Sequence, residues 1–186
     1  MQSKLLIETM NIFVTNNCPK ISAEALDNKR VVKMVLETAQ LLSTAIFINT
    51  HITYDNLYKP THIKHPCTIW ASLNLSNWDW LFQHFVALCQ EYSFRYNRQH
   101  ASEKISPYLL KYRTDIKHGA MTAFANCARS NTLQIDFKHM KDACEAYRKY
   151  LIARWHHDKL PPKWINRKPP IWYITDLQNM NEISRY

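Results

Sequence analysis

The chain has 186 residues, enough for one domain with a substantial apolar core, and a formal net charge of +9 at pH 7. Its single glycine, Gly119, excludes glycine-rich phosphate-binding loops and dinucleotide fingerprints, and it disfavours sheets built from tight hairpins. We therefore predict a mainly α fold: a single compact helical domain over residues 1–186, with little or no β structure and an extended aromatic and basic C-terminal tail, residues 155–186, packed on it.

The five cysteines are odd in number and form no C-x-x-C pair, and the first residues do not resemble a signal peptide. We therefore expect reduced thiols in a cytoplasmic compartment. Because no uncharged apolar run reaches 18 residues, we also expect no membrane span. The sequence leaves the oligomeric state open.

Basic residues concentrate in one part of the chain. Residues 138–170 contain nine Lys or Arg against three acidic residues. Such a concentration favours a polyanionic partner, and nucleic acid is the commonest one.

The first elements are short. After a lead-in over residues 1–9, the run MNIFV at residues 10–14 fits a short strand or a buried extended segment, which Asn16, Asn17 and Pro19 then interrupt. Ser22 is a candidate N-cap for the helix that follows.

The helix predicted over residues 26–44 is apolar on most sides and carries one narrow polar strip. The strip consists of Arg30, Lys33, Glu37, Gln40 and Thr44. Two interpretations remain open. The strip is either the solvated edge of a core helix, with Lys33 and Glu37 paired at i,i+4, or the wall of a cleft in which Glu37 is a working carboxylate.

Residues 49–66 form a turn-rich loop of functional length that contains three histidines. His62 and His65 have H-x-x-H spacing, but no further ligand follows at a recognisable spacing. We therefore predict no metal site and no cofactor, and we expect these histidines to position a phosphate or to shape the loop.

A second helix is predicted over residues 76–97, starting with the capping-box pattern of Ser76 and Asp79. Arg95 and Arg98 lie off its apolar stripe and are candidate phosphate contacts, although simple solvation is the alternative. Beyond it we predict one short helix over residues 120–128 and a last long helix capped by Asp136.

The tail WHHDKLPPKWINRKPPIWY, from Trp155 to Tyr173, alternates cations with aromatic rings. Cations neutralise phosphates, and exposed rings stack on unpaired bases, so Trp164, Arg167, Lys168 and Trp172 are candidate DNA contacts. The alternative is a proline-rich segment strapped over the domain with its tryptophans as packing anchors.

Three segments together resemble the pyrimidine-dimer DNA glycosylase family, the small helical enzymes also called endonuclease V, and most closely its uncharacterised phage and bacterial relatives. The run LDNKRVVKMVLETAQ is similar to the family's acidic residue, basic residue and catalytic glutamate, which places Asp27 or Asn28, Arg30 and Glu37 on that motif. Gln40 stands where the characterised enzymes carry an arginine.

The other two segments extend the resemblance. Residues 65–100 are similar to the family's second long helix, with a leading His65 and a trailing E-x-x-x-R, and the aromatic, basic C-terminus is similar to the tail with which these enzymes contact DNA. The resemblance implies the cytoplasm of a bacterial or virus-infected cell.

The resemblance also implies a mechanism. These enzymes flip a base out of the helix, attack the first carbon of its sugar with an N-terminal α-amine to form an imine, and cleave the strand by β-elimination. A glutamate close to the amine moves the protons. Here MNIF at residue 10 resembles the family's usual start, while Lys29 and Lys33 lie near Glu37 in the sequence, so the source of the amine stays open.

We therefore expect a DNA N-glycosylase, with or without abasic-site lyase activity, that acts on a modified or damaged base. The resemblance implies Glu37 and Arg30 as catalytic residues, and Lys33 is a further catalytic candidate because it lies near Glu37. The resemblance also implies DNA as the partner, bound through its phosphate backbone and a flipped or unpaired base. The alternatives are a non-catalytic nucleic-acid-binding protein on the same scaffold and an enzyme acting on free pyrimidine nucleotides.

Overall fold

The computed structural model describes residues 10–183, with side chains described up to residue 180; the lead-in predicted over residues 1–9 lies outside this range. Helices dominate the described chain, and the mainly α prediction is confirmed. The elements are α1 (Pro19–Ala25), α2 (Asn28–Thr50), α3 (Pro66–Ser72), α4 (Leu75–Tyr96), η1 (Ala101–Ile105), α5 (Ser106–Tyr112), η2 (Arg113–Asp115), β1 (Arg129–Ser130), β2 (Ile135–Asp136), α6 (Ala143–His157) and α7 (Ile171–Ile183). The strands β1 and β2 form one short antiparallel hairpin.

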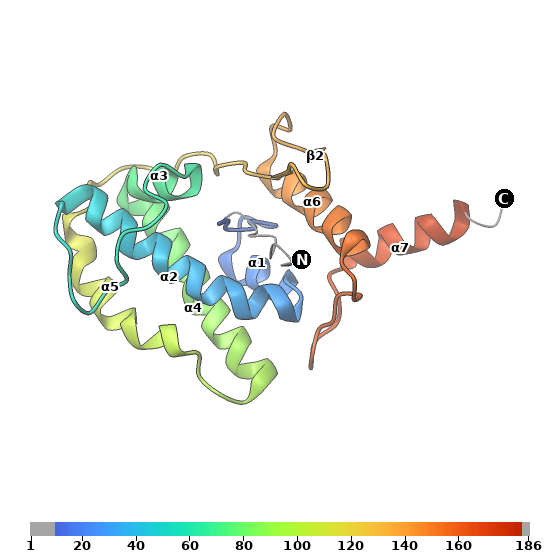
Figure 1. Cartoon of the computed structure of the whole chain (residues 1–186), viewed down its shortest axis with the longest axis horizontal. Helices are drawn as coiled ribbons and strands as arrows, with labels where there is room; N and C mark the ends of the chain where they lie inside the picture. Colours follow the sequence, from blue (N-terminus) through green and yellow to red (C-terminus); the bar gives the residue numbers. More distant parts are fainter. Residues whose placement is uncertain (1–9, 184–186) are drawn as a thin grey trace, which may run out of the picture.

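Helix α2 is the centre of the fold and packs against α3 and α4, while α1 lies against α4 (Figure 1). Its apolar sides supply fully buried residues that include Met34, Leu41, Leu42 and Ile46. Contrary to our expectation, an 18-residue window of α2 is long and apolar enough to cross a membrane. However, 61% of that window is buried inside the structure, as in a core helix.

The two long helices end on residues with left-handed backbone. His51 follows α2 with φ 57°, and Asn97 follows α4 with φ 51°. In each case the N–H of this residue donates to the carbonyl four residues earlier, Phe47 or Ser93, which closes the last turn.

Helix α4 begins differently from the prediction. Asn74, not Ser76, is the N-cap, because its Oδ1 accepts a hydrogen bond from the backbone N of Asn77 at 3.0 Å. The Ser76 hydroxyl instead donates to the carbonyl of Gly119 at 2.6 Å. A Cβ atom at Gly119 would lie 2.9 Å from the Cβ of Asn74. The sole glycine therefore allows a distant segment to approach the start of α4 closely.

The N-terminal predictions were partly wrong. Residues 10–15 form a buried segment without strand pairing, as the second alternative predicted, but Phe13 has left-handed backbone with φ 44°, so the segment is not extended throughout. Ser22 does not cap α2 but lies inside α1, where its hydroxyl accepts hydrogen bonds from the backbone N of Thr15 and Asn16. Asp27 takes the N-cap position of α2.

The C-terminal half also differs. Residues 120–128 contain no helix, because side chains of other elements take their backbone groups; the N–H of Thr122, for example, donates to Asn77 Oδ1. The last long helix, α6, is capped by Asp142, and the predicted cap Asp136 lies in β2. The tail predicted to be extended is helical at both ends: residues 155–157 belong to α6, residues 158–170 form no helix, and α7 then projects away from the rest of the fold (Figure 1).

Candidate functional site

The polar strip of α2 holds the candidate catalytic carboxylate. Glu37 Oε1 lies 3.1 Å from Lys33 Nζ, so the i,i+4 pair predicted from the spacing is present. The Glu37 side chain is only 12% exposed, against 31% for Lys33. Glu37 is therefore largely enclosed, which strengthens its electrostatic interactions relative to those of a solvated carboxylate.

Arg30 lies two helical turns before Glu37 on the same strip, and its side chain is buried. Its guanidinium lies 2.9 Å from Asp27 Oδ1 and 3.1 Å from Asp158 Oδ2, and the side chain is 1% exposed. The indole N–H of Trp155 donates to the same oxygen of Asp27 at 2.9 Å. This network fixes the start of α2 to the end of α6. In this structure Arg30 therefore positions elements and does not face solvent.

The loop of residues 51–65 lies along the other end of the strip. The hydroxyl of Thr44 accepts a hydrogen bond from the backbone N of Thr61 at 3.1 Å. His62 follows directly and is exposed, with its Nδ1 2.8 Å from the Thr61 hydroxyl. Gln40, one turn before Thr44, is partly exposed. The hydrogen bond between Thr61 and Thr44 thus places His62 beside the turn of α2 that follows Gln40.

His65 ends this loop and caps α3. Its Nδ1 accepts a hydrogen bond from the backbone N of Cys67 at 3.2 Å. Burial, and to a smaller extent the nearby His62, lower the pKa of His65, so its ring is neutral at neutral pH.

Two of the predicted phosphate contacts are used inside the protein. Glu91, itself buried, accepts hydrogen bonds from Arg95 Nε at 2.7 Å and from Arg167 NH2 at 2.6 Å. The Arg95 side chain is fully enclosed. The hydrogen bond to Glu91 raises the pKa of Arg167. Because both guanidinium groups neutralise Glu91, they are poorly placed to bind DNA phosphates.

The tail residues around Arg167 are held on the helical core. The backbone N of Asn28 donates to the carbonyl of Lys163 at 2.8 Å, and Trp164 Nε1 donates to the carbonyl of Ala25 at 3.1 Å. The N–H of Ile165 donates to Asn28 Oδ1 at 3.1 Å. We call residues 163–167 the strap, because they join the chain's C-terminal part to the α1–α2 junction.

The tail tryptophans pack on one another. The Trp155 ring lies 5.2 Å from Trp164 and 5.4 Å from Trp172, and Tyr173 joins the same group. Trp164 and Trp172 are partly buried. These contacts favour the packing-anchor interpretation of the tail.

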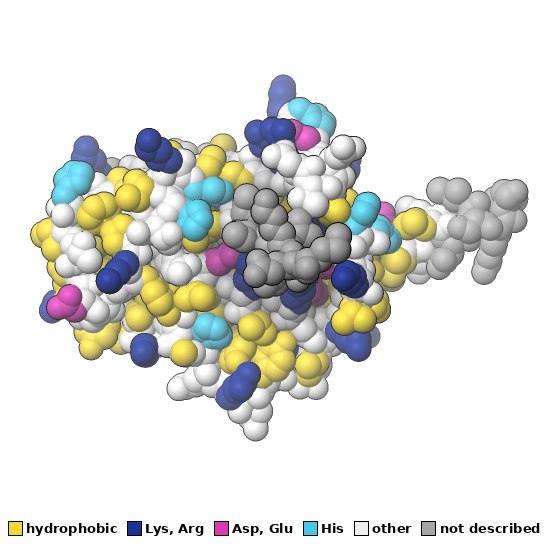
Figure 2. Space-filling view, in the orientation of Figure 1, with side chains coloured by type: hydrophobic (Ala, Val, Ile, Leu, Met, Phe, Trp, Pro, Cys, Tyr) yellow, Lys and Arg dark blue, Asp and Glu magenta, His cyan; other side chains and the backbone are white. Residues whose placement is uncertain are grey.

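Other cations of the candidate set are exposed. Arg98 and Lys168 are on the surface, as are Lys138, Lys141 and Lys163 in the basic part of the chain. Figure 2 shows Lys and Arg side chains over the β1–β2 hairpin and near the point where α7 leaves the body. The basic region therefore offers charge to solvent.

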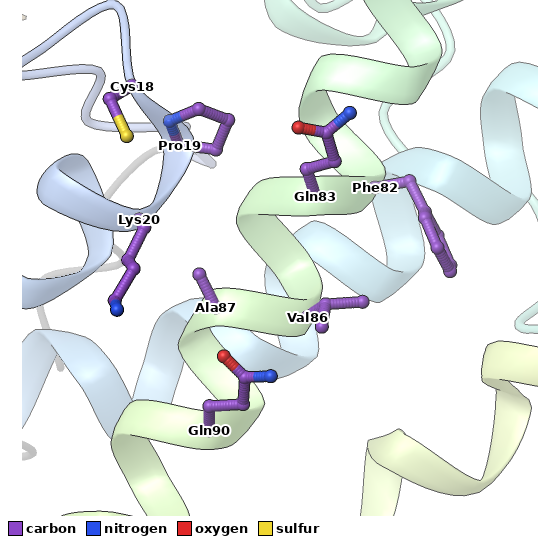
Figure 3. A pocket seen from close by; sticks show the side chains of 8 residues that line it. All are labelled: Cys18, Pro19, Lys20, Phe82, Gln83, Val86, Ala87 and Gln90. Carbon is purple, nitrogen blue, oxygen red and sulfur yellow. The ribbon is translucent and has the colours of Figure 1, made fainter.

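Two cavities lie away from the strip. The first, of about 420 Å³, runs between the start of α1, at Cys18, Pro19 and Lys20, and the α4 face that carries Phe82 and Gln90 (Figure 3). The second, of about 630 Å³, lies between α4 and η1. Glu37 lines neither of these two cavities.

The sequence analysis missed a cluster around α3. The thiol of Cys67 donates to Cys127 Sγ at 3.7 Å, and Tyr147 Oη lies 4.0 Å from Cys67 Sγ. The hydrogen bond between the two cysteines lowers the pKa of Cys127. The same hydrogen bond, together with burial, raises the pKa of Cys67. Sixty positions separate the two cysteines, so their spacing carried no signal.

The strip, its enclosed carboxylate and the basic surface define a helical protein suited to a polyanionic substrate. A family model described as pyrimidine dimer DNA glycosylase matches residues 10–104. Because the match covers just over half of the chain, the protein belongs to this family of DNA glycosylases, for which DNA is the substrate. The match begins at Met10 and includes Glu37, Glu91 and Arg95. Comparisons with curated proteins and with solved structures gave no match.

Proposed function

We propose that the protein is a DNA N-glycosylase that releases a modified or damaged pyrimidine, with Glu37 as the catalytic carboxylate. The observation that carries this proposal is the position of Glu37, which lies on α2 within the matched region, 12% exposed and 3.1 Å from a lysine ammonium. An enclosed carboxylate next to a cation is suited to stabilising positive charge on a sugar and to moving protons.

The proposed reaction proceeds in two stages. An unprotonated amine forms a bond to C1′ of the sugar while the bond from C1′ to the base breaks, and the departing base takes a proton from water. Glu37 accepts a proton from the attacking nitrogen and passes it to the ring oxygen as the sugar opens to an imine. It then removes a proton from C2′, and the C3′–O bond breaks by β-elimination. The second stage is the abasic-site lyase step.

Two groups can supply the amine: the α-amine of the chain and Lys33 Nζ, which is already at Glu37. An α-amine has an ordinary pKa of about 7.7–8.0, against about 10.4 for lysine, so a larger fraction of it is nucleophilic at neutral pH. Either amine gives the same imine, and only mapping of the modified peptide separates them.

The proposed DNA contacts follow from exposure. Gln40 and His62 border the strip, and Arg98 and Lys168 are exposed cations that can meet phosphates. Trp164 and Trp172 are partly exposed and would contact a base without leaving their cluster.

Reductive trapping tests the proposal. The protein is incubated with duplexes that contain an abasic site or an ultraviolet-induced pyrimidine dimer, with borohydride added to reduce an imine. We expect a covalent adduct with the wild type. Glu37→Gln should lower base release and strand cleavage at least about 100-fold, as for loss of a general acid–base, with little change in DNA affinity.

Glu145→Gln is the matched control. Glu145 also pairs with a lysine four residues away, Lys149, at 3.2 Å, but both side chains are 52% exposed. Its activity should equal the wild type. Unchanged turnover of Glu37→Gln would remove Glu37 from the mechanism. Tight DNA binding without adduct or base release would support a non-catalytic nucleic-acid-binding protein. Salt-insensitive binding of a free pyrimidine nucleotide would support an enzyme that acts on free nucleotides.

A further inference from the structure

Three metal-binding side chains converge at the start of α3, outside the proposed reaction centre. A ring nitrogen of His65 and the sulfurs of Cys67 and Cys127 all lie within 4.8 Å of one another. Cys67 is fully buried, whereas His65 and Cys127 are partly exposed. The cluster is therefore partly buried, and two of its three residues are partly exposed to solvent.

The backbone holds these groups in place. His65 is the N-cap of α3 and Cys67 lies in its first turn, so the helix start fixes both. The backbone N of Cys127 donates to Tyr147 Oη at 3.0 Å, and Tyr147 Oη donates to the carbonyl of Ala125 at 3.0 Å. Tyr147 thus fixes the segment that carries Cys127 against α6.

The geometry fits a tetrahedral thiolate site. Two sulfurs, each about 2.3 Å from a tetrahedral zinc ion, lie about 3.8 Å apart. The observed separation of 3.7 Å between the two sulfurs matches this spacing. A disulfide would require about 2.05 Å. The presence of an imidazole nitrogen beside both sulfurs distinguishes the cluster from a simple pair of thiols.

We propose that His65, Cys67 and Cys127 bind one Zn²⁺ ion, with the fourth position open to water. Zinc binds thiolate and imidazole ligands readily, whereas magnesium and calcium prefer oxygen ligands. The site departs from our expectation that the chain binds no metal, and it is independent of the proposed glycosylase reaction.

Binding would exchange one hydrogen bond for a metal bond. His65 Nδ1 now accepts from the backbone N of Cys67. If Nδ1 coordinates the ion, its lone pair is no longer available to this N–H. If Nε2 coordinates, Nδ1 carries the proton and cannot accept. In both cases the ion replaces a bond of 3.2 Å, at the weak end of the usual range.

The ion would connect two parts of the chain. His65 and Cys67 lie within the region that the family model matches, and Cys127 lies beyond it, in the segment between η2 and β1. A bound ion would fasten this segment to α3 and so stabilise the folded state, because the unfolded chain does not hold the three ligands together.

Cobalt binding tests the site with a visible probe. The reduced full-length protein, freed of metal by a chelator, is titrated with Co²⁺ and then with Zn²⁺. We expect one equivalent of Co²⁺ to bind with sulfur-to-cobalt charge-transfer absorption, and one equivalent of Zn²⁺ to displace it. The zinc-loaded protein should also have a higher melting temperature, and the partly exposed thiol of Cys127 should no longer react with a thiol reagent.

Variants locate the ligands. Cys127→Ser and His65→Gln should each weaken Co²⁺ binding at least about 100-fold, with the first also losing part of the charge-transfer absorption. Cys144→Ser and Cys89→Ser, which change buried thiols outside the cluster, should bind as the wild type does. Circular dichroism confirms that each variant is folded, and Cys67→Ser is not needed for the conclusion.

Three results would overturn the proposal. The first is binding of less than half an equivalent of Co²⁺ by the reduced wild type. The second is unchanged affinity in both Cys127→Ser and His65→Gln. The third is tight binding without sulfur-to-cobalt absorption, which would place the metal elsewhere. In each case the two sulfurs form only the thiol hydrogen bond, and the test of Glu37 is unaffected.

Discussion

His84 shows how one buried side chain can set the acid sensitivity of the fold. It lies on α4, fully buried, with Nδ1 2.9 Å from the carbonyl of Pro19 and its ring stacked on Trp80. Burial lowers the pKa of His84 to about 4, only partly opposed by hydrogen bonds to backbone groups. The folded protein therefore keeps this ring neutral at pH values where the unfolded chain protonates it.

The sign of the pH dependence follows. Above pH 6.5 neither state binds the proton, and between pH 6.5 and about 4 only the unfolded state does, so stability falls as the pH falls. The full loss is roughly 3 kcal/mol. We expect His84→Gln to lose less stability than the wild type between pH 7 and pH 4.5, measured by urea unfolding. Parallel pH profiles of the two proteins would contradict this assignment.

At the scale of elements, Glu91 joins α4 to the strap. It is 3% exposed and neutralises both Arg95 and Arg167. Glu91→Gln would leave two guanidinium groups without their shared countercharge, one of them fully enclosed. We expect a loss of about 3–5 kcal/mol in the free energy of unfolding, the usual effect of breaking a buried ion pair.

The control for this prediction is again Glu145→Gln, whose exposed pair with Lys149 should contribute less than about 1 kcal/mol. Chemical denaturation of the two variants gives the comparison. Equal, small losses would mean that water reaches Glu91 and that the strap is held by its backbone contacts and by Trp164.

The long helices were predictable because their apolar residues recur with helical period over many turns. Helix starts were not, since several Asn, Asp and Ser residues can cap: Asp136 and Asp142 carry the same chemistry, and only Asp142 precedes α6. Residues 120–128 contain several alanines, which favour a helix. Their hydrogen bonds to Asn77 and Tyr147 override that propensity.

The same limit applies to the site. Glu37 and Lys33 were predictable as a pair, because both lie on one helix at a spacing of four. Arg95 was predicted to be a phosphate contact, with simple solvation as the alternative, because its position on α4 does not reveal that its guanidinium is bound by Glu91 and Asn28. Cys67 and Cys127 meet only through the path of the chain between α5 and β1, which no local pattern encodes.

At the scale of the whole molecule, charge is distributed unevenly. The basic stretch 138–170 lies on α6, the strap and the hairpin region, and its exposed lysines are free of the Glu91 network. For binding to duplex DNA we expect the logarithm of affinity to fall linearly with the logarithm of salt concentration. Replacing both Lys163 and Lys168 by Gln should reduce the slope by about 2, because each phosphate contact contributes about 1.

Lys111→Gln is the control, since this exposed lysine lies on α5, at the opposite end of the body from α7 (Figure 1). Its salt dependence should equal that of the wild type. Equal slopes for all variants would place the DNA-binding surface away from the strap.

The left-handed residues that close α2 and α4 have a consequence for how the protein could change. A side chain with a Cβ atom adopts this conformation at a cost of about 1–2 kcal/mol, less for asparagine, and glycine adopts it freely. Neither His51 nor Asn97 is glycine, in a chain that has a single glycine elsewhere. Glycine in place of His51 or Asn97 would therefore raise the thermal stability of the protein without altering its core or the surface proposed to meet DNA.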